Sequence, residues 1–225
     1  SRGLGDVYKR QMLYSLIEAS IIKRSAKVVV PSICWATDLS PLIQLSLQPI
    51  ICDCNLDNLA VDVDHLEQIF IEESPGVLLL VSVLGISPEM NLISELCQKY
   101  NVILLEDNCE SLGSMFRNRK LGTFGLMTSF SSYFGHHIST IEGGFIGTDD
   151  EELYHILKAI RSHGWDRDLP KKVQKELRNE WSISDFDSLY TFYYAGFNLR
   201  STDLQARTVS YTHLRAHETD SYLVC

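Results

Sequence analysis

The sequence lacks the features that mark several large classes of protein. No run of about 18 apolar residues occurs, so a membrane-spanning helix is not expected. Acidic residues outnumber basic ones, and the formal net charge of -9 argues against non-specific binding of nucleic acid, which needs a basic face. The chain has only six cysteines and no CxxC pair, too few for a disulfide scaffold. We therefore expect reduced thiols in a cytoplasmic protein.

The composition is otherwise that of an ordinary folded protein, because 45% of the residues are hydrophobic and 22% are charged. The two ends differ from the rest. Residues 1–11, SRGLGDVYKRQ, and residues 207–225 resemble translated sequencing-adapter read-through, and neither carries a helical or strand pattern that continues its neighbour. We expect both to be foreign to the natural protein and exclude them from the fold prediction. Residues 12–206 are then expected to be a partial large domain, an internal piece of a longer protein.

Short runs that are apolar at every position alternate with helical patterns along this domain. Such runs are typical of parallel strands covered on both faces, and they are Val28–Val30, Pro49–Cys52, Val77–Val81 and Val102–Leu105. Helical patterns cover Val63–Ile71, Pro88–Tyr100 with Ser87 as N-cap, and a segment that a Thr148–Glu151 capping box opens and that stops near Gly164. The alternation predicts an α/β domain with a mostly parallel sheet between helices.

The segment Trp165–Tyr194 is charged and aromatic, and its periodicity is weak. It is expected to run over the surface. Two interpretations have equal weight: the aromatic side chains mark an interface or a lid over a site, or they anchor a solvated loop.

Two stretches carry residues suited to chemistry. The fourth apolar run ends in Glu106–Asp107, where an acid at a strand end can meet a ligand or cap a turn. The stretch Ser129–Gly144, SFSSYFGHHISTIEGG, combines small hydroxylated residues, two histidines and a glycine pair. Ser131 and Ser132 are candidates for binding a phosphate, and either histidine for proton transfer near neutral pH.

The two histidines admit two other interpretations. A metal site would use His136, His137 and Glu142, but adjacent residues on a strand point to opposite faces and cannot easily share one ion. We therefore predict no metal. A structural pair of histidines, hydrogen-bonded within a turn, is the remaining alternative.

Six motifs in order identify a family. They are VPSICWATDLSPLIQ, ILLEDNCESLGS, LGTFG, FSSYFGHHISTIEGG, RSHGWDRDL and GFNLRSTDLQA, and they cover roughly residues 12–206. Together they resemble the PLP-dependent sugar-nucleotide aminotransferase superfamily, the DegT/DnrJ class of fold type I. The resemblance implies a large domain with a mixed seven-stranded sheet between helices. It also implies a dimer with two active sites at the interface, and pyridoxal 5'-phosphate (PLP) as cofactor.

The resemblance also implies roles for individual residues. Asp107 matches the acid that pairs with the pyridinium nitrogen of PLP, and Trp35 matches the aromatic residue that stacks on the cofactor ring. Glu110 falls near the ring hydroxyl, and Ser131 matches a serine that binds the phosphate. Asn198 matches an asparagine that reaches the phosphate in the partner subunit's site.

His136 departs from the aminotransferase pattern, because it stands where those enzymes carry the lysine that binds PLP covalently, and His137 stands where asparagine is usual. An imidazole cannot form that bond, but it can move a proton. The pattern is similar to the 3-dehydratases of the superfamily, which act on 4-keto-6-deoxy sugar nucleotides. The resemblance then implies that glutamate converts PLP to pyridoxamine 5'-phosphate (PMP) and that His136 is catalytic.

Some dehydrases of this class bind an iron–sulfur cluster through a cysteine-rich loop. The segment Trp165–Tyr194 contains no cysteine, so we expect neither a cluster nor a reductase partner. Two alternatives stay open: an aminotransferase of the same family in which another residue supplies the amine, and a non-catalytic relative. The phosphate loop and the small C-terminal domain of the family lie outside the matched motifs, so this piece is expected to be inactive by itself.

Overall fold

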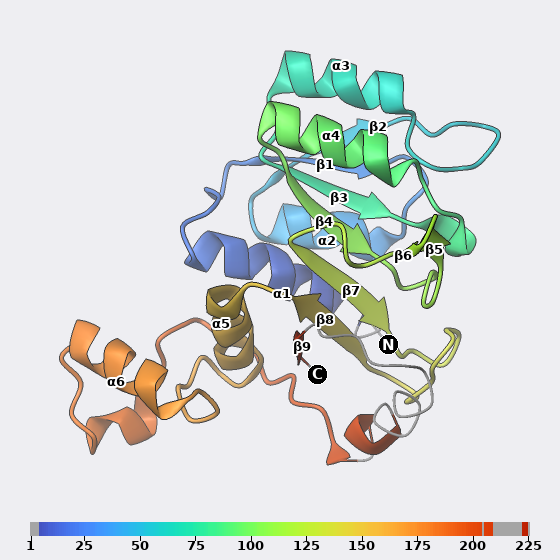
Figure 1. Ribbon diagram of the computed structural model, residues 1–225. Coiled ribbons are helices and arrows are strands. Elements are labelled where there is room, and N and C mark those ends of the chain that lie inside the picture. The colour runs from blue at the N-terminus through green and yellow to red at the C-terminus, as the bar shows by residue number, and fades with distance from the viewer. Residues whose placement is uncertain (1–4, 204, 209–221, 225) are drawn as a thin grey trace.

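The computed structural model describes residues 5–203, 205–208 and 222–224 (Figure 1). Seven strands form one sheet in the order β2-β1-β3-β4-β7-β8-β9. Their bounds are β1 Lys27–Pro31, β2 Gln48–Cys52, β3 Val77–Val81, β4 Ile103–Asp107, β7 Met127–Ser131, β8 Gly144–Thr148 and β9 Tyr222–Val224. The first five strands in this order are parallel, whereas β8 is antiparallel to β7 and β9 to β8. This is the expected mostly parallel, mixed sheet between helices, as in PLP-dependent transferases of fold type I.

The sheet is accompanied by the α-helices α1 to α6, and a further helical turn is described at residues 205–208. The bounds of these helices are α1 Gly5–Glu18, α2 Ala36–Gln44, α3 Val63–Glu73, α4 Met90–Tyr100, α5 Glu151–Arg161 and α6 Lys171–Glu180. A short hairpin, β5 Met115–Phe116 and β6 Arg119–Lys120, stands apart from the sheet. None of the helices in the described part of the chain is long and apolar enough to cross a bilayer.

The helices cover the two faces of the sheet separately, which gives three layers (Figure 1). One core joins α1, α2 and α5 to strand residues such as Leu79 and Leu105. The other joins α3 and α4 to Leu78, Leu80 and Leu104. Consecutive strand residues thus enter opposite cores, since side chains alternate along a strand. This explains why the strands are apolar at every position.

The strands lie at the predicted runs, but β1 is one residue longer at each end, β2 begins one residue earlier, and β4 begins one residue later and extends through Glu106 and Asp107. The prediction that Pro49–Cys52 is covered on both faces is wrong, because β2 is the edge strand of the sheet and only Cys52 is buried in it. Two predicted helix caps are wrong. The N-cap of α4 is Glu89 rather than Ser87, whose hydroxyl donates to the carbonyl of Pro88 (3.0 Å). The N-cap of α5 is Asp150, which accepts from the N–H of Leu153 (2.9 Å). Thr148 is instead the last residue of β8 and donates to the carbonyl of Leu126 (2.9 Å).

The two segments that the sequence set apart show regular structure where they are described. Helix α1 begins at Gly5, so the expectation that no helical pattern runs through residues 1–11 is wrong for residues 5–11. The reason is tertiary, because Lys9 and Gln11 are buried along with Met12 and Leu13. Strand β9 lies within residues 207–225. The foreign origin of both segments stays a prediction.

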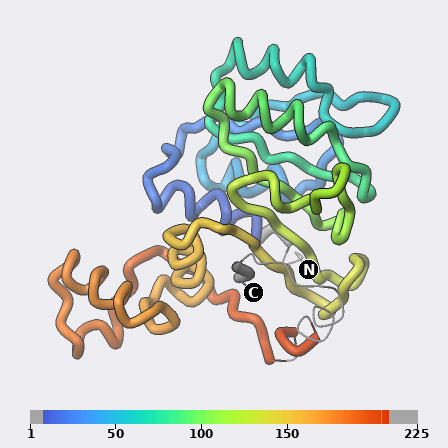
Figure 2. The backbone as a smooth tube through the Cα atoms, viewed as in Figure 1, coloured from blue at the N-terminus to red at the C-terminus, as the bar shows by residue number. Residues whose placement is uncertain are grey.

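The aromatic segment Trp165–Tyr194 extends away from the sheet (Figure 2). It contains a helix, α6, that its weak periodicity hid, since Gln174 is the helix's only buried residue. Arg178 fixes the segment by donating to the buried Asp166 (2.8 Å) and to Asp185 (2.9 Å). The choice between an interface and a solvated loop stays open.

Glu106 ties the loop that follows β4 to the end of the sheet. Its side chain is buried and accepts three backbone hydrogen bonds of 2.7 Å each, from Gly122, Phe124 and Gly125. All three donors belong to the LGTFG motif. Because Glu106 and Asp107 are adjacent on a strand, their side chains point to opposite faces of the sheet. Glu106 binds the turn on one face, and Asp107 is available for contacts on the other face.

We predict that Glu106→Ala lowers the free energy of unfolding by about 3 kcal/mol, because three N–H groups lose a charged acceptor. Glu106→Gln should lower it less, since the amide keeps one acceptor oxygen. Urea denaturation measures both variants. Glu95→Ala, on the exposed side of α4, is the control and should change little. Equal effects of Glu106→Ala and Glu95→Ala would contradict the prediction.

Candidate active site

The parallel strands bring several predicted residues together at the C-terminal ends of the strands. Asp107 is the last residue of β4, and its partner in register on β7 is Ser129. Ser131 ends β7 two residues further on, and Trp35 lies after β1, at the N-cap of α2. Ligands of open α/β sheets bind at this carboxyl edge. The topology therefore places Asp107, Ser131 and Trp35 where a ligand is expected.

Asp107 is a buried carboxylate, with 3% of its surface exposed. One oxygen, Oδ1, accepts hydrogen bonds from the Cys109 N–H (3.1 Å) and the Ser129 hydroxyl (3.2 Å). The other, Oδ2, forms an ion pair with the ammonium of Lys9 in α1. Burial by itself raises the pKa of Asp107, but the charge of Lys9 and the hydrogen bonds outweigh it and hold the pKa below its usual value. The group is thus an anion with a cation beside it.

Asp38 is a second buried acid at this place, which the sequence analysis missed. Its Oδ1 lies 2.6 Å from Lys9 Nζ, and its Oδ2 accepts from the backbone N–H of Trp35 (2.8 Å). Burial and the neighbouring Asp107 carboxylate raise the pKa of Asp38 to about 7, against the opposing charge of Lys9. Asp38 lies in the first turn of α2 and accepts from the N-cap backbone, but the sequence signal is weak, because tryptophan has no side-chain acceptor for the other half of a capping box.

Lys9 completes this cluster. Its ammonium is 3% exposed, and it also donates to the hydroxyl of Thr37 (3.2 Å). Burial lowers the pKa of Lys9, but the charges of Asp107 and Asp38 raise it by more, so the amine is held as a cation. Three elements, α1, α2 and β4, therefore meet in one charged and almost completely buried group.

Trp35 and Glu110 lie at the margin of this cluster. The Trp35 side chain is 73% exposed, so its ring is open to a partner. Glu110 is exposed as well, and its Oε2 accepts from the N–H of Leu84 (2.7 Å). This bond ties the loop after β4 to the turn Val83–Gly85 that follows β3. The predicted contacts of both residues with a cofactor stay predictions.

The loop between β7 and β8 holds the predicted phosphate and catalytic residues. Ser131 is buried, and its hydroxyl accepts from the N–H of Tyr133 (3.2 Å). Hydrogen bonds from Ser132 to the Gly143 carbonyl (3.0 Å) and from Thr140 to the Ser132 carbonyl (2.8 Å) close the loop. The loop therefore leaves the end of β7 as a backbone-bonded turn.

His136 lies within this loop and is half-buried. Its backbone N–H donates to the Tyr133 carbonyl (3.0 Å), and its ring packs edge-on against the Tyr133 ring, with 6.1 Å between the ring centres. No side-chain hydrogen bond to either ring nitrogen of His136 occurs in the described part of the chain. The imidazole is therefore not tied into the turn as a structural histidine would be, whereas the neighbouring His137 is exposed.

Asn198 is not part of the charged cluster. It is exposed and pairs with Ser162 through an isolated antiparallel bridge at the end of α5. Its predicted role in a partner's site stays a prediction. No group of three or more His, Cys, Asp or Glu side chains in the described ranges is arranged to hold a metal ion.

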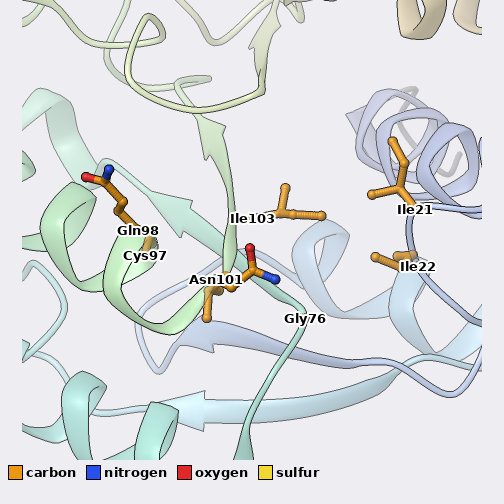
Figure 3. A pocket seen from close by; sticks show the side chains of 8 residues that line it. Ile21, Ile22, Gly76, Cys97, Gln98, Asn101 and Ile103 are labelled. Atoms are coloured by element: carbon orange, nitrogen blue, oxygen red, sulfur yellow. The ribbon is translucent and has the colours of Figure 1, made fainter.

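A cavity of about 520 Å³ lies at the N-terminal ends of strands β3 and β4 (Figure 3). Gly76, just before β3, and Ile103, the first residue of β4, mark this amino edge, and Ile21, Ile22 and Asn101 also line the cavity. Since ligands of such sheets bind at the carboxyl ends of the strands, we place the candidate site at Asp107 and not in this cavity.

Comparisons with known proteins agree with the geometry. Residues 12–219 match the sequence profile of the DegT/DnrJ/EryC1/StrS aminotransferase family. The chain is 40% identical over 183 residues to the GDP-4-keto-6-deoxy-D-mannose 3-dehydratase of Escherichia coli O55:H7, an alignment that covers 81% of this chain and 46% of that protein. The chain spans about half the length of the curated relatives it matches.

Solved structures show the same fold. The chain is similar to the E. coli GDP-4-keto-6-deoxy-D-mannose-3-dehydratase with bound hydrated PLP, with a TM-score of 0.83 and 36% identity over 94% of this chain and 54% of that one. It is equally similar to a GDP-4-keto-6-deoxymannose-3-dehydratase with a trapped PLP–glutamate geminal diamine, with a TM-score of 0.83 and 36% identity over 92% and 53% of the two chains.

We predict that the free energy of unfolding of Asp38→Asn, relative to that of the parent chain, increases as the pH rises from 4 to 7. The folded state keeps a proton on Asp38 that the unfolded state releases above its ordinary pKa of 3.8, so ionisation of Asp38 costs stability across this range. Asparagine cannot ionise and avoids that cost. The depressed pKa of Asp107 acts below this range, where stability is lost as the pH falls. Urea denaturation at several pH values is the measurement, and parallel stability curves would refute the prediction.

Proposed function

The chain belongs to the DegT/DnrJ/EryC1/StrS aminotransferase family, and on this premise we propose that it is part of a PLP- and PMP-dependent sugar-nucleotide 3-dehydratase. The reaction is removal of the 3-hydroxyl of a 4-keto-6-deoxy sugar nucleotide, as in its relative, GDP-4-keto-6-deoxymannose 3-dehydratase. The observation that carries the proposal is His136, an imidazole with no structural hydrogen bond among the described residues, at the position where aminotransferases of the family carry lysine.

The residues at the carboxyl edge fit the cofactor. Asp107 is an ionised, buried carboxylate with one oxygen turned to a cationic N–H donor, which is the chemistry that a pyridinium nitrogen requires. The exposed Trp35 ring is available for stacking, and Ser131, with the loop that follows it, is available for the phosphate. Glu110 would lie near the ring hydroxyl, and Asn198 would serve the phosphate in the partner subunit's site. When bound, PLP supplies an electron sink.

In the proposed reaction each of these residues has a separate role. Asp107 keeps the ring nitrogen protonated, because a buried anion favours the charged form of its partner. His136 takes a proton from the cofactor carbon that carries the amine, and it delivers a proton to the departing 3-hydroxyl, directly or through a water. Glutamate is the proposed amino donor that regenerates PMP. The absence of a lysine at position 136 leaves the cofactor without a covalent tether.

The proposal extends to the setting of this enzyme, and the resemblance to a lipopolysaccharide biosynthesis protein supports its pathway alone. We place it in deoxysugar and lipopolysaccharide O-antigen biosynthesis, in the cytoplasm, as a homodimer. Since Trp165–Tyr194 contains no cysteine, the proposal includes no iron–sulfur cluster and no reductase partner.

The first test concerns His136 in a full-length enzyme that contains this chain. We expect His136→Asn to keep its affinity for PLP, because Asp107, Trp35 and Ser131 remain, and to lose roughly two to four orders of magnitude in the rate of dehydration. His136→Lys should attach PLP covalently, so that borohydride fixes the cofactor to position 136.

Peptide mapping after borohydride treatment provides the control. The unaltered enzyme with PLP alone should yield no labelled lysine. If borohydride fixes PLP to a lysine of the unaltered enzyme, the aminotransferase alternative replaces the dehydratase. If glutamate does not convert PLP to PMP in the enzyme, and His136→Asn dehydrates the substrate as fast as the parent, the proposal that His136 is catalytic fails.

The second test concerns the partner subunit. Asn198→Ala and Asp107→Ala should each inactivate the full-length enzyme, whereas a mixture of the two should regain part of the activity. A mixed dimer has one site with both residues intact only if Asn198 serves the neighbour. Subunit exchange is checked by mass spectrometry of differently tagged chains, and exchange without recovered activity would show that Asn198 acts within its own subunit.

A further inference from the structure

The loop between β7 and β8, residues 132–143, contains a strained residue, Ile141. Its φ of 70° lies in the left-handed region, which β-branched residues rarely adopt. The Ile141 side chain is 78% exposed, so packing of that side chain does not compensate the strain. Such a conformation persists only where the surrounding structure imposes it. We call residues 132–143 the His136 loop and ask which hydrogen bonds hold it.

Two backbone hydrogen bonds lead from Ile141 to the candidate catalytic residue. The Ile141 carbonyl accepts from the N–H of Phe134 (3.1 Å). One residue earlier, the Tyr133 carbonyl accepts from the N–H of His136 (3.0 Å), and the rings of Tyr133 and His136 pack edge-on. The position of the imidazole therefore depends on the conformation of the chain at Ile141.

The residue after Ile141 is held by two side chains. The backbone carbonyl of Glu142 accepts from the hydroxyl of Thr140 (3.0 Å) and from the side-chain amide of Gln205 (2.5 Å). Thr140 belongs to the loop itself, and its hydroxyl lies 2.7 Å from that of Ser132. Gln205 belongs to the motif GFNLRSTDLQA, 63 residues further along the chain. The bond from Gln205 thus connects the His136 loop to a separate part of the chain.

The amide group of Gln205 is fixed in orientation. Its Oε1 accepts from the backbone N–H of Thr202 (2.7 Å), and the Thr202 hydroxyl accepts from the backbone N–H of Gln205 (3.3 Å). This reciprocal pair of bonds is the capping box of a helix start. Because Oε1 is used in the cap, the amide nitrogen is directed at the Glu142 carbonyl.

We propose that Gln205 is a positioning residue for His136. The inference rests on the proposed function, and Gln205 acts through the loop rather than on the reacting atoms. Its amide N–H holds the Glu142 carbonyl and with it the left-handed conformation of Ile141, so that the imidazole keeps one position at the end of β7. Gln205 and the His136 loop both lie within residues 12–206, the range that the six motifs cover.

The first experiment needs no cofactor. Hydrogen–deuterium exchange is measured by mass spectrometry on the full-length enzyme that contains this chain, without PLP. We expect Gln205→Glu to speed exchange in peptides of the His136 loop about tenfold, because a carboxylate can still accept from Thr202 but has no N–H for Glu142. Peptides of α3 should exchange as in the parent. Gln98→Glu, the same change at an exposed position of α4, is the matched control.

Two further variants separate the bond to Glu142 from the helix cap and test the strain. Gln205→Ala removes the capping acceptor as well. If Gln205→Ala speeds loop exchange and Gln205→Glu does not, the cap holds the loop and the inference is wrong; unchanged exchange in both variants also overturns it. Asparagine adopts the left-handed conformation more readily than isoleucine, so adding Ile141→Asn to Gln205→Glu should slow the exchange again. No such rescue would contradict the link through Ile141.

The second experiment separates the positioning of His136 from a general structural role. Gln205→Glu should lower kcat of dehydration about tenfold and change KM and PLP affinity less than about twofold. The reason is that Asp107, Trp35 and Ser131 lie outside the His136 loop. In the His136→Asn enzyme, adding Gln205→Glu should lower the rate no further, since no imidazole remains to be positioned. Equal losses with and without His136 would show a purely structural role.

The outcomes separate this inference from the function on which it rests. If dehydration depends on His136 and Gln205→Glu leaves kcat unchanged, the positioning role is wrong while the proposed function stands. If Gln205→Glu speeds loop exchange but the parent enzyme shows no dehydration that depends on His136, Gln205 holds the loop, and the proposed function fails together with the role of Gln205 in it.

Discussion

A buried negative charge at the carboxyl edge of the sheet is the constraint on which the site depends. Asp107 stays ionised while buried because the charge of Lys9 and hydrogen bonds from Cys109, Ser129 and Asp38 stabilise its carboxylate. An occupant of this place must therefore bring positive charge and an N–H group. In this structure Lys9 supplies that charge and the N–H donor.

Alternation along a single strand separates support from chemistry. Glu106 and Asp107 are neighbours in sequence with opposite surroundings: Glu106 faces the side of α3 and α4 and binds the backbone of the LGTFG turn. Asp107 faces the side of α1 and α2 and meets charged side chains. Glu106 thus fixes the loop that follows the strand. Because Glu106 binds this backbone, the Asp107 side chain is available for other contacts.

The loop after β7 shows the same division between anchoring and reactivity. Its closing bonds use the backbone and hydroxyl groups of Ser132, Thr140 and Gly143, and none of those bonds uses an imidazole. Within the described residues, neither ring nitrogen of His136 has a side-chain hydrogen bond. In the proposed function His136 takes the place of the aminotransferase lysine, and an imidazole cannot form the covalent bond that an amine forms with the cofactor.

Features that depend on local pattern and residue type were predictable from the sequence. Wholly apolar runs such as Val77–Val81 predicted strands buried on both faces, and six ordered motifs predicted the family and its fold. The histidine at position 136 could be read directly, because the residue type alone says which functional group the side chain carries. Helix caps were less predictable, since Asp150 and Thr148 both suit a helix start and only the end of β8 excludes Thr148.

Which charged side chains meet depends on how the helices pack on the sheet. Residues 9, 38 and 107 belong to α1, α2 and β4, and no spacing in the sequence places them together. Their contact follows from packing α1 and α2 on the face of the sheet toward which Asp107 points. Burial thereby brings two carboxyl groups and one ammonium into contact with almost no exposure to water.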